Sequence, residues 1–219
     1  MTAFLAIETS TDACSAALWQ DHQVIDRFAL AARQHSNLLL GMVAELLAEA
    51  QIKLKNLDGV AYGQGPGSFM GVRLATGVAQ GLAFGADLPV IGISSLQALA
   101  QQGQQELQED AIVAGWDARM QEIYWGCYIK DDHGLMQPCD LEQVSSPASI
   151  EFPKGRDWVV VGNAWETYAD KIKLIGKSYL LYPRAREVAI LAAQYPKLIS
   201  PEQAEPHYLR QQVAWKKPT

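Results

Sequence analysis

The chain has 219 residues, of which 49% are apolar and 19% charged, and its formal net charge is −6. This is a globular composition, long enough for one large domain or two small ones without disulfides or metals. A net negative chain is not expected to bind nucleic acid by itself, because neutralising phosphates requires a basic surface. Residues 1–110 carry 5 basic and 11 acidic side chains, so the whole net negative charge lies in the first half of the chain. This asymmetry is a mild sign of two structural units.

Cysteine usage and hydropathy predict a cytoplasmic protein with no membrane contact. The cysteines, Cys14, Cys127 and Cys139, are odd in number and fit no zinc or disulfide spacing, which favours a reducing compartment. The first residues lack a basic stretch, and their apolar run ends at Glu8, so no signal peptide is predicted. The longest apolar stretch, 74–86, is too short and too polar to span a bilayer.

The chain opens with three predicted strands, at 4–7, 14–19 and 24–30. Short polar turns separate them, so we expect antiparallel hairpins and not a Rossmann-type strand followed by a helix. A helix over 36–50 follows, with one apolar stripe and a second face of small residues. A helix with two such faces can pack on two sides.

A glycine-rich segment, 63–68, follows a short buried strand at 59–62 and opens a helix over 69–84. That helix has a single charged residue and several glycines, each of which costs ~1 kcal/mol relative to alanine. Close approach of another backbone would explain them, so core packing and a subunit interface stay equally open. The candidate interface residues on the two helices are Leu40, Gly41, Ala44, Ala48, Gly71, Arg73, Ala75, Val78, Ala79 and Leu82.

The second half repeats the strand, acidic turn, strand opening of the first. We expect two domains, 1–105 and 106–219, divided at the glutamine-rich end of a helix, with the last residues free to pack back on the first domain. Residues 131–157 are rich in turn formers and receive no assignment. The other predicted elements are a strand at 89–93, a helix capped by Ser94 or Ser95 that ends in solvent over 101–106, paired strands at 111–116 and 122–129, a strand at 158–161 entering a helix at Asn163, a helix at 186–195, and an extended piece at 206–210 followed by 213–217.

Two kinds of segment could hold a phosphate. The glycines of Gly65-Pro66-Gly67-Ser68 allow backbone N–H groups to approach an anion at a helix N-terminus, although a tight turn with Ser68 as the N-cap is favoured. The turn at 8–12 and the turn at 117–119 would form a nucleotide clamp if they faced each other across a cleft. The candidate nucleotide-binding residues are Glu8, Ser10, Thr11, Gly65, Gly67, Ser68, Asp117 and Arg119.

Metal and nucleophile chemistry have no support in the sequence. No two of the four histidines stand at ligand spacing, and Leu39 lies one helical turn after His35. Ser68 is not in a G-x-S-x-G elbow, and no cysteine has an evident histidine partner. We therefore predict no catalytic residue and no metal ligand.

Four segments, in order over nearly the whole chain, resemble signature segments of the TsaB (YeaZ) family of bacterial tRNA threonylcarbamoyladenosine biosynthesis proteins. They are Leu5-Ala6-Ile7-Glu8-Thr9-Ser10-Thr11, residues 61–73 around Gly65-Pro66-Gly67-Ser68, Asp117-Ala118-Arg119-Met120-Gln121-Glu122-Ile123-Tyr124, and Pro206-His207-Tyr208-Leu209-Arg210. The resemblance implies an α/β fold of two related lobes, of the actin/Hsp70-like (ASKHA, ribonuclease H-like) class. Residues 131–205 match only loosely.

The resemblance also implies a role in placing threonylcarbamoyl on the adenosine next to the anticodon, in tRNAs reading codons that begin with adenine. In that family this subunit is not the catalyst. It binds and activates the metal-dependent TsaD subunit, with TsaE as an ATPase partner, and it pairs with TsaD or with itself through the helices at 36–50 and 69–85. The resemblance thus predicts a scaffold that meets tRNA only through the complex, without the metal-binding histidine pair.

Three points stay open. Met70 stands where the family usually has threonine, which weakens phosphate contact at the glycine-rich segment. ATP or ADP with Mg²⁺ could still occupy the cleft or the partner interface, although the chain is expected to have no cofactor of its own. The alternative functions are a stand-alone ATP-dependent enzyme of the same fold, such as a small kinase, and in last place a peptidase.

Overall fold

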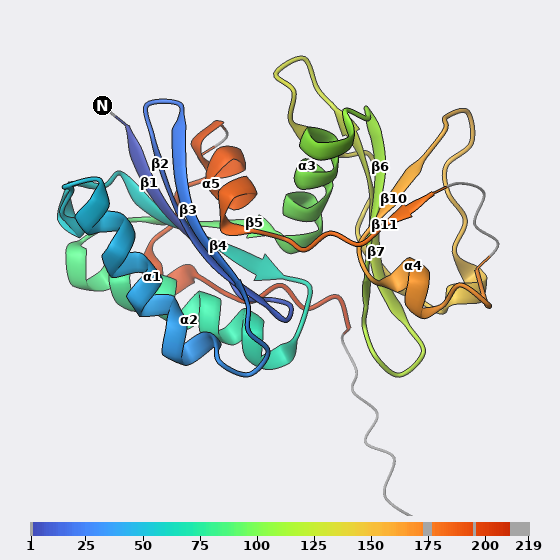
Figure 1. The fold of residues 1–219 in the computed structure, drawn as a ribbon, viewed down its shortest axis with the longest axis horizontal. Coiled ribbons are helices and arrows are strands. Elements are labelled where there is room, and N and C mark those ends of the chain that lie inside the picture. The colour runs from blue at the N-terminus through green and yellow to red at the C-terminus, as the bar shows by residue number, and fades with distance from the viewer. Residues whose placement is uncertain (1, 173–176, 195, 211–219) are drawn as a thin grey trace, which may run out of the picture.

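The structure is a computed structural model that describes residues 2–172, 177–194 and 196–210. Two α/β lobes lie side by side, and each is built on one twisted sheet (Figure 1). No helix in these ranges is long and apolar enough to cross a membrane.

The first sheet has the strand order β3-β2-β1-β4-β5. As the polar turns predicted, β1 (Ala3–Glu8), β2 (Ala13–Gln20) and β3 (Gln23–Leu30) pair antiparallel. The next two strands, β4 (Gly59–Gly65) and β5 (Val90–Ser94), run parallel to β1. Parallel neighbours need a crossover connection, which here is helical.

Helices cover both faces of this sheet, so its central strand is buried throughout. On one face lie α1 (His35–Glu49) and α2 (Phe69–Ala86), packed on side chains such as Leu5 and Ile7. The alternate residues of β1 point to the opposite face, which α5 (Ala185–Gln194) covers. Full burial of one such leucine or isoleucine stabilises the fold by roughly 1.5–3 kcal/mol.

The second sheet repeats the topology of the first. Its antiparallel strands are β6 (Ala111–Asp117), β7 (Ile123–Lys130) and β8 (Met136–Pro138), and β10 (Val159–Val161) and β11 (Ser178–Tyr179) run parallel to β6. The predicted echo between the two halves is thus a repeated strand order. The unassigned region also holds a short strand, β9 (Gln143–Ser145), on β7, and a 3-10 turn at Pro147–Ser149.

The two lobes exchange their last helices. The helix after β5, α3 (Ser95–Leu107), packs on the second sheet through Leu96 and Leu99, whereas α5 follows β11 and packs on the first (Figure 1). The second lobe has one further short helix, α4 (Ala164–Thr167). A single cut near residue 105 therefore falls inside a helix that already belongs to the second lobe by packing.

The predicted solvated end of α3, over 101–106, is wrong at its start, where Gln101 and Gln102 are buried; Gln104 and Gln105 are half-buried and Glu106 is exposed. The Gln101 amide donates to the Gly134 carbonyl at 3.2 Å and accepts from the Met136 N–H at 2.9 Å. Gln102 donates to Glu106 at 2.7 Å. A polar side chain can be buried when its hydrogen bonds are made inside the protein. The two bonds of Gln101 fix α3 to the start of β8.

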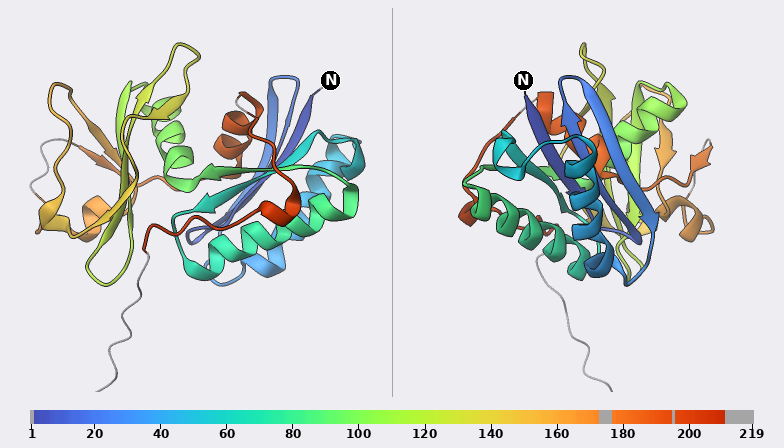
Figure 2. Two further views of the ribbon diagram at one scale, coloured as in Figure 1. Left: turned by 180° about the vertical axis from the view of Figure 1, so that it is seen from behind. Right: turned by 60° about the vertical axis from the view of Figure 1, so that its left-hand side comes forward.

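After α5 the chain runs back along the first lobe and then reaches the second (Figure 2). Ile199 pairs with Val90 on the sheet edge, and the His207 N–H donates to the Gln64 carbonyl at 2.6 Å. The extended piece predicted at 206–210 is thus held against the glycine-rich segment. The segment predicted at 213–217 lies outside the described residues.

Candidate functional site

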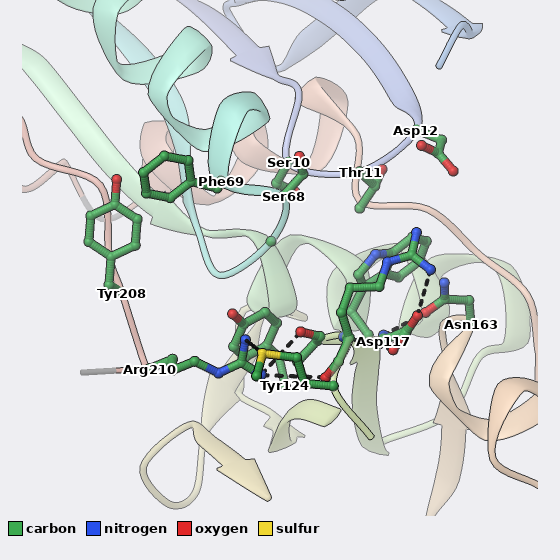
Figure 3. Close-up of a pocket in the computed structure, with 15 residues that line it drawn as sticks. Ser10, Thr11, Asp12, Ser68, Phe69, Asp117, Tyr124, Asn163, Tyr208 and Arg210 are labelled. Atoms are coloured by element: carbon green, nitrogen blue, oxygen red, sulfur yellow. Dashed lines mark hydrogen bonds and ion pairs between the residues drawn. The ribbon is translucent and has the colours of Figure 1, made fainter. Parts of the chain in front are cut away.

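A cavity of about 700 Å³ lies between the lobes, where the β1–β2 turn faces the β6–β7 turn (Figure 3). Six of the eight candidate nucleotide-binding residues line it, from both lobes: Ser10, Thr11, Gly67, Ser68, Asp117 and Arg119. The facing turns expected from the sequence therefore exist. A cavity of this size can hold a nucleotide-sized molecule, and nucleotide binding stays a prediction.

Glu8 and Gly65 do not line the cavity, contrary to the sequence-based expectation. Glu8 is fully buried, and its carboxylate accepts hydrogen bonds from the Ser10 N–H at 2.5 Å and the Ser95 hydroxyl at 2.7 Å. Burial raises the pKa of Glu8, and these hydrogen bonds oppose the shift. Gly65 has φ +99° and lies beneath the His207 carbonyl. Glu8 thus links the β1–β2 turn to the start of α3, and Gly65 lies against the C-terminal segment.

The glycine-rich segment allows the β1–β2 turn and the start of α2 to pack closely together. The Ser68 N–H already donates to the Ser10 carbonyl at 2.6 Å, so it is not free for an anion. A Cβ at Gly71 would stand 2.0 Å from the Thr9 carbonyl oxygen, and the Thr9 hydroxyl donates to the Gly71 carbonyl at 2.7 Å. The Ser68 hydroxyl accepts from the Gly71 N–H, so the N-cap prediction is confirmed.

Asp117 lines the cavity, and its carboxylate is hydrogen-bonded to neighbouring residues. One oxygen accepts from the Tyr168 hydroxyl at 2.7 Å and from the Arg119 N–H at 2.9 Å. The other oxygen pairs with the Arg119 guanidinium at 3.1 Å, and the Asp117 side chain is only 8% exposed. Burial, together with the Asp117 carboxylate, raises the pKa of Tyr168 to about 12. These contacts hold the β6–β7 turn in place.

Two cavity residues from the C-terminal segment were not among the predicted site residues. Tyr208 stacks on Phe69 with ring centroids 6.0 Å apart, and its hydroxyl accepts from Arg73 at 2.8 Å. Arg210 donates to Glu122 at 3.0 Å and to the Ala118 carbonyl at 3.1 Å. The segment thereby joins α2 of the first lobe to the β6–β7 turn of the second.

The wall of the second lobe adds an aromatic and an amide that were also missed. Tyr124 of β7 lines the cavity, as does Asn163, which follows the parallel strand β10. Asn163 accepts from the Asp117 N–H at 2.8 Å. Its place at the carboxyl end of a parallel strand is a signal that could have found it, because ligand sites of α/β sheets lie there.

The described part of the chain contains no group of side chains that could bind a metal ion. There, no three His, Cys, Asp or Glu side chains come close enough to hold an ion. His35, the first residue of α1, instead places Nε2 2.9 Å from the Thr11 carbonyl oxygen.

The candidate partner face on α1 and α2 is narrower than the sequence predicted. Gly71, Ala75 and Ala79 are buried inside the lobe, because that side of α2 packs on the sheet. The candidates that remain exposed or half-buried are Leu40, Gly41, Ala44 and Ala48 on α1 and Arg73, Val78 and Leu82 on α2. Met70 is also exposed, and it does not line the cavity.

Three exposed glycines of α2, Gly77, Gly81 and Gly85, were not among the candidates. A Cβ at any of them would meet no heavy atom of the described residues within 4 Å outside their own helix surroundings, and the same holds for Gly41 on α1. These four glycines and the candidates that stay accessible are called the thin face below. The sequence already indicated such positions, because glycines inside a predicted helix suggest the close approach of another backbone.

Comparison with known proteins gives consistent matches. Residues 29–217 match the family model described as TsaD, tRNA N6-adenosine threonylcarbamoyltransferase. The chain is 40% identical to the tRNA threonylcarbamoyladenosine biosynthesis protein TsaB of Escherichia coli, covering 97% of this chain and 96% of that one. The TsaB of Haemophilus influenzae is also 40% identical, over 97% of this chain and 95% of its own. The solved structure of YeaZ from Pseudomonas aeruginosa superposes with a TM-score of 0.90 at 38% identity, covering 95% of this chain and all of that one.

Proposed function

The chain belongs to the TsaB family of tRNA threonylcarbamoyladenosine biosynthesis proteins and has the two-lobed actin/Hsp70-like fold, and from this premise we propose its part in that modification. We propose that it is a non-catalytic subunit that binds and activates a TsaD-like catalytic subunit. The modified base is then the adenosine next to the anticodon of tRNAs that read codons beginning with adenine. A TsaE-like ATPase is a further partner, and tRNA is met only through the complex in the cytoplasm.

The thin face carries the proposal. The exposed glycines of the thin face each cost the monomer about 1 kcal/mol relative to alanine, and none of the described residues packs against them. The close approach of another helix would use them, because it brings backbones together where side chains are missing. Leu40, at 54% exposed, adds apolar surface beside them. The thin face therefore suits a TsaD-like subunit, or a second copy of this chain in its absence.

The bonding of Asp117 supports a non-catalytic role. A Mg²⁺ ion at this carboxylate would have to displace or share contacts with Tyr168 and Arg119, which already bind both of its oxygens. ATP or ADP in the cavity would then bind without being turned over. A stand-alone kinase remains the competing function, and it predicts ATP turnover by the purified chain. A metallopeptidase would need a cluster of metal ligands, and the described residues contain none.

Reconstitution tests the proposal directly. The chain is mixed with the cognate TsaD-like and TsaE-like proteins, ATP, tRNA and a threonylcarbamoyl donor, and transfer to tRNA is measured with and without it. We expect transfer only when the chain is present and a stable pair with the TsaD-like protein at micromolar concentration. Folded proteins that fail to associate, or transfer that does not need this chain, would overturn the proposal.

A variant of the thin face makes the test specific. In Gly81→Arg a long side chain enters open space, so the monomer stays folded while the partner is held away. The matched control is Gln194→Arg, which adds the same charge at the exposed last residue of α5. We expect at least a tenfold loss of affinity, worth about 1.4 kcal/mol, for the first variant only. A change at Ala79 would not serve, because that residue is fully buried.

A further inference from the structure

Cys127 and Cys139 lie opposite each other on neighbouring strands. The register of β7 and β8 pairs Tyr128 with Pro138, so the next pair is Cys127 with Cys139. The Cys139 N–H donates to the Cys127 carbonyl at 3.0 Å, which continues the ladder by that one pair. Opposite residues of an antiparallel pair point their side chains to the same face, with Cα atoms about 4.5–5.5 Å apart. Disulfides span Cα distances of roughly 4.4–6.8 Å, so the Cα spacing of such a pair falls within the range that a disulfide can bridge.

The two thiols differ in access. Cys139 is exposed, whereas Cys127 is only 3% exposed among the core residues of the second lobe. The Cys139 thiol lies 3.3 Å from the Cys127 carbonyl oxygen, so it already rests over its neighbour's backbone. A small disulfide in solution can therefore reach Cys139 first, and Cys127 lies next to it as the second thiol. Cys14, the remaining free cysteine, is buried in the other lobe.

We propose that Cys127 and Cys139 form a dithiol that closes to an intramolecular disulfide when a small-molecule disulfide such as oxidised glutathione is present. The Cys139 thiolate attacks one sulfur of that disulfide and expels the other as a thiolate, which leaves a mixed disulfide on Cys139. The Cys127 thiolate then attacks the Cys139 sulfur and expels the second thiolate. The two protein protons end on the two released thiols, and the two electrons reduce the small disulfide.

The environment makes this reaction slow at neutral pH. Burial raises the pKa of Cys127 to about 12, with Cys139 and Asp140 adding to the shift. The pKa of Cys139 is also raised, by burial first and by Asp140, while Arg156 lowers it. Because the thiolate is the attacking species, the small thiolate fraction of both cysteines at neutral pH makes each exchange step slow.

The disulfide would restrain a loop that contacts the link between the lobes. Residues 139–142 connect β8 to β9, and Glu142 accepts hydrogen bonds from the Tyr128 hydroxyl, at 2.6 Å, and from Ser94. Ser94 is the N-cap of α3, the helix that leads from the first sheet to the second. Tying residue 139 to β7 therefore holds Glu142 against the cap of that helix.

The test uses the native full-length chain in glutathione buffers at pH 8, followed by alkylation and mass spectrometry. We expect the loss of two hydrogen atoms and a disulfide between tryptic peptides 120–130 and 131–154. Cys14→Ser keeps this link, and Cys139→Ser abolishes it. A persistent glutathione adduct on Cys139 without the link, a link to Cys14, or a chain that stays fully reduced would each overturn the proposal.

Hydrogen exchange of the linked and reduced forms then tests the loop restraint. We expect the amides of Leu141 and Glu142 to exchange at least threefold more slowly in the linked form. Equal exchange rates would overturn the restraint while leaving the disulfide itself established.

Discussion

Gly67 lies directly against Ser10: a Cβ at Gly67 would stand 2.4 Å from the Ser10 carbonyl oxygen, to which the Ser68 N–H donates at 2.6 Å. The glycine is therefore required by a contact inside the first lobe. The contact fixes the start of α2 to the first hairpin turn, and this pair of segments forms one wall of the cavity. A glycine-rich segment before a helix here serves packing first.

Replacing Gly67 by alanine should destabilise the first lobe. The added methyl group would overlap a backbone oxygen, which cannot rotate away as a side chain can, and overpacking of this kind costs about 1–3 kcal/mol. The free energy of unfolding, measured by urea titration, would show the loss. The matched control is Gly77→Ala, in open space within the following helix α2, which should gain up to about 1 kcal/mol. Equal effects of the two variants would contradict the packing role.

Local pattern was enough to predict the hairpins, α1 and α2, because each is encoded within its own residues. The exchange of α3 and α5 between lobes was not predictable in this way, since it depends on which sheet each helix meets in the folded chain. The burial of Gln101 and Gln102 was missed for a related reason. Their hydrogen-bond partners come from residues 106, 134 and 136 and include backbone groups that composition does not show.

The site was half predictable for a similar reason. Ser10 and Asp117 stand at corresponding turns of the two repeated halves, and this repetition is visible in the sequence. Tyr208 and Arg210 reach the cavity only because the chain returns across both lobes after α5. Glu8 was assigned to the site from its place in a polar turn, whereas its hydrogen bonds to Ser10 and Ser95 draw the carboxylate inward.

Asp117 is expected to matter for stability and not for ATP turnover. Asp117→Ala leaves the Tyr168 hydroxyl and the Arg119 N–H without their acceptor, which costs about 1–3 kcal/mol. Tyr168→Phe removes one of these bonds and should cost less. Thermal unfolding measures both, and a phosphate-release assay should show no ATP turnover in either variant or in the unchanged chain. Turnover that disappears in Asp117→Ala would favour the kinase alternative.

Arg210 is expected to couple the two lobes. Its guanidinium bonds Glu122 and the Ala118 carbonyl, while the neighbouring Tyr208 bonds Arg73 on α2. The side chains of Arg210 and Glu122 are 17% and 39% exposed, so solvent screening limits the loss in Arg210→Ala to about 1 kcal/mol. Hydrogen exchange in the β6–β7 turn should rise in this variant. Arg210→Lys keeps the charge but loses the second hydrogen bond. Its exchange rate in the β6–β7 turn should lie between those of the unchanged chain and Arg210→Ala.

Glu187 should make stability fall as the pH rises. It lies in the first turn of α5 and is only 2% exposed, and one of its oxygens has no hydrogen-bond partner among the described residues. Burial raises its pKa to about 7, against the opposing effects of its own backbone N–H, Arg184 and Arg186, and Asp26 adds to the shift. The folded chain thus favours the protonated carboxyl. Its contribution is complete below the unfolded pKa of about 4.5 and is lost as the pH rises through 7.

Glu187→Gln keeps this side chain neutral at every pH. The free energy of unfolding of the variant should therefore rise relative to that of the unchanged chain between pH 5 and pH 8. The expected difference between its effects at the two pH values is on the order of 2–3 kcal/mol, because each pKa unit is worth about 1.4 kcal/mol. Urea titration at both pH values measures it. Any pH dependence from Glu8 is common to both chains and cancels. The control is Glu166→Gln, at an exposed position of α4, and an equal effect of Glu187→Gln at pH 5 and pH 8 would contradict a protonated Glu187.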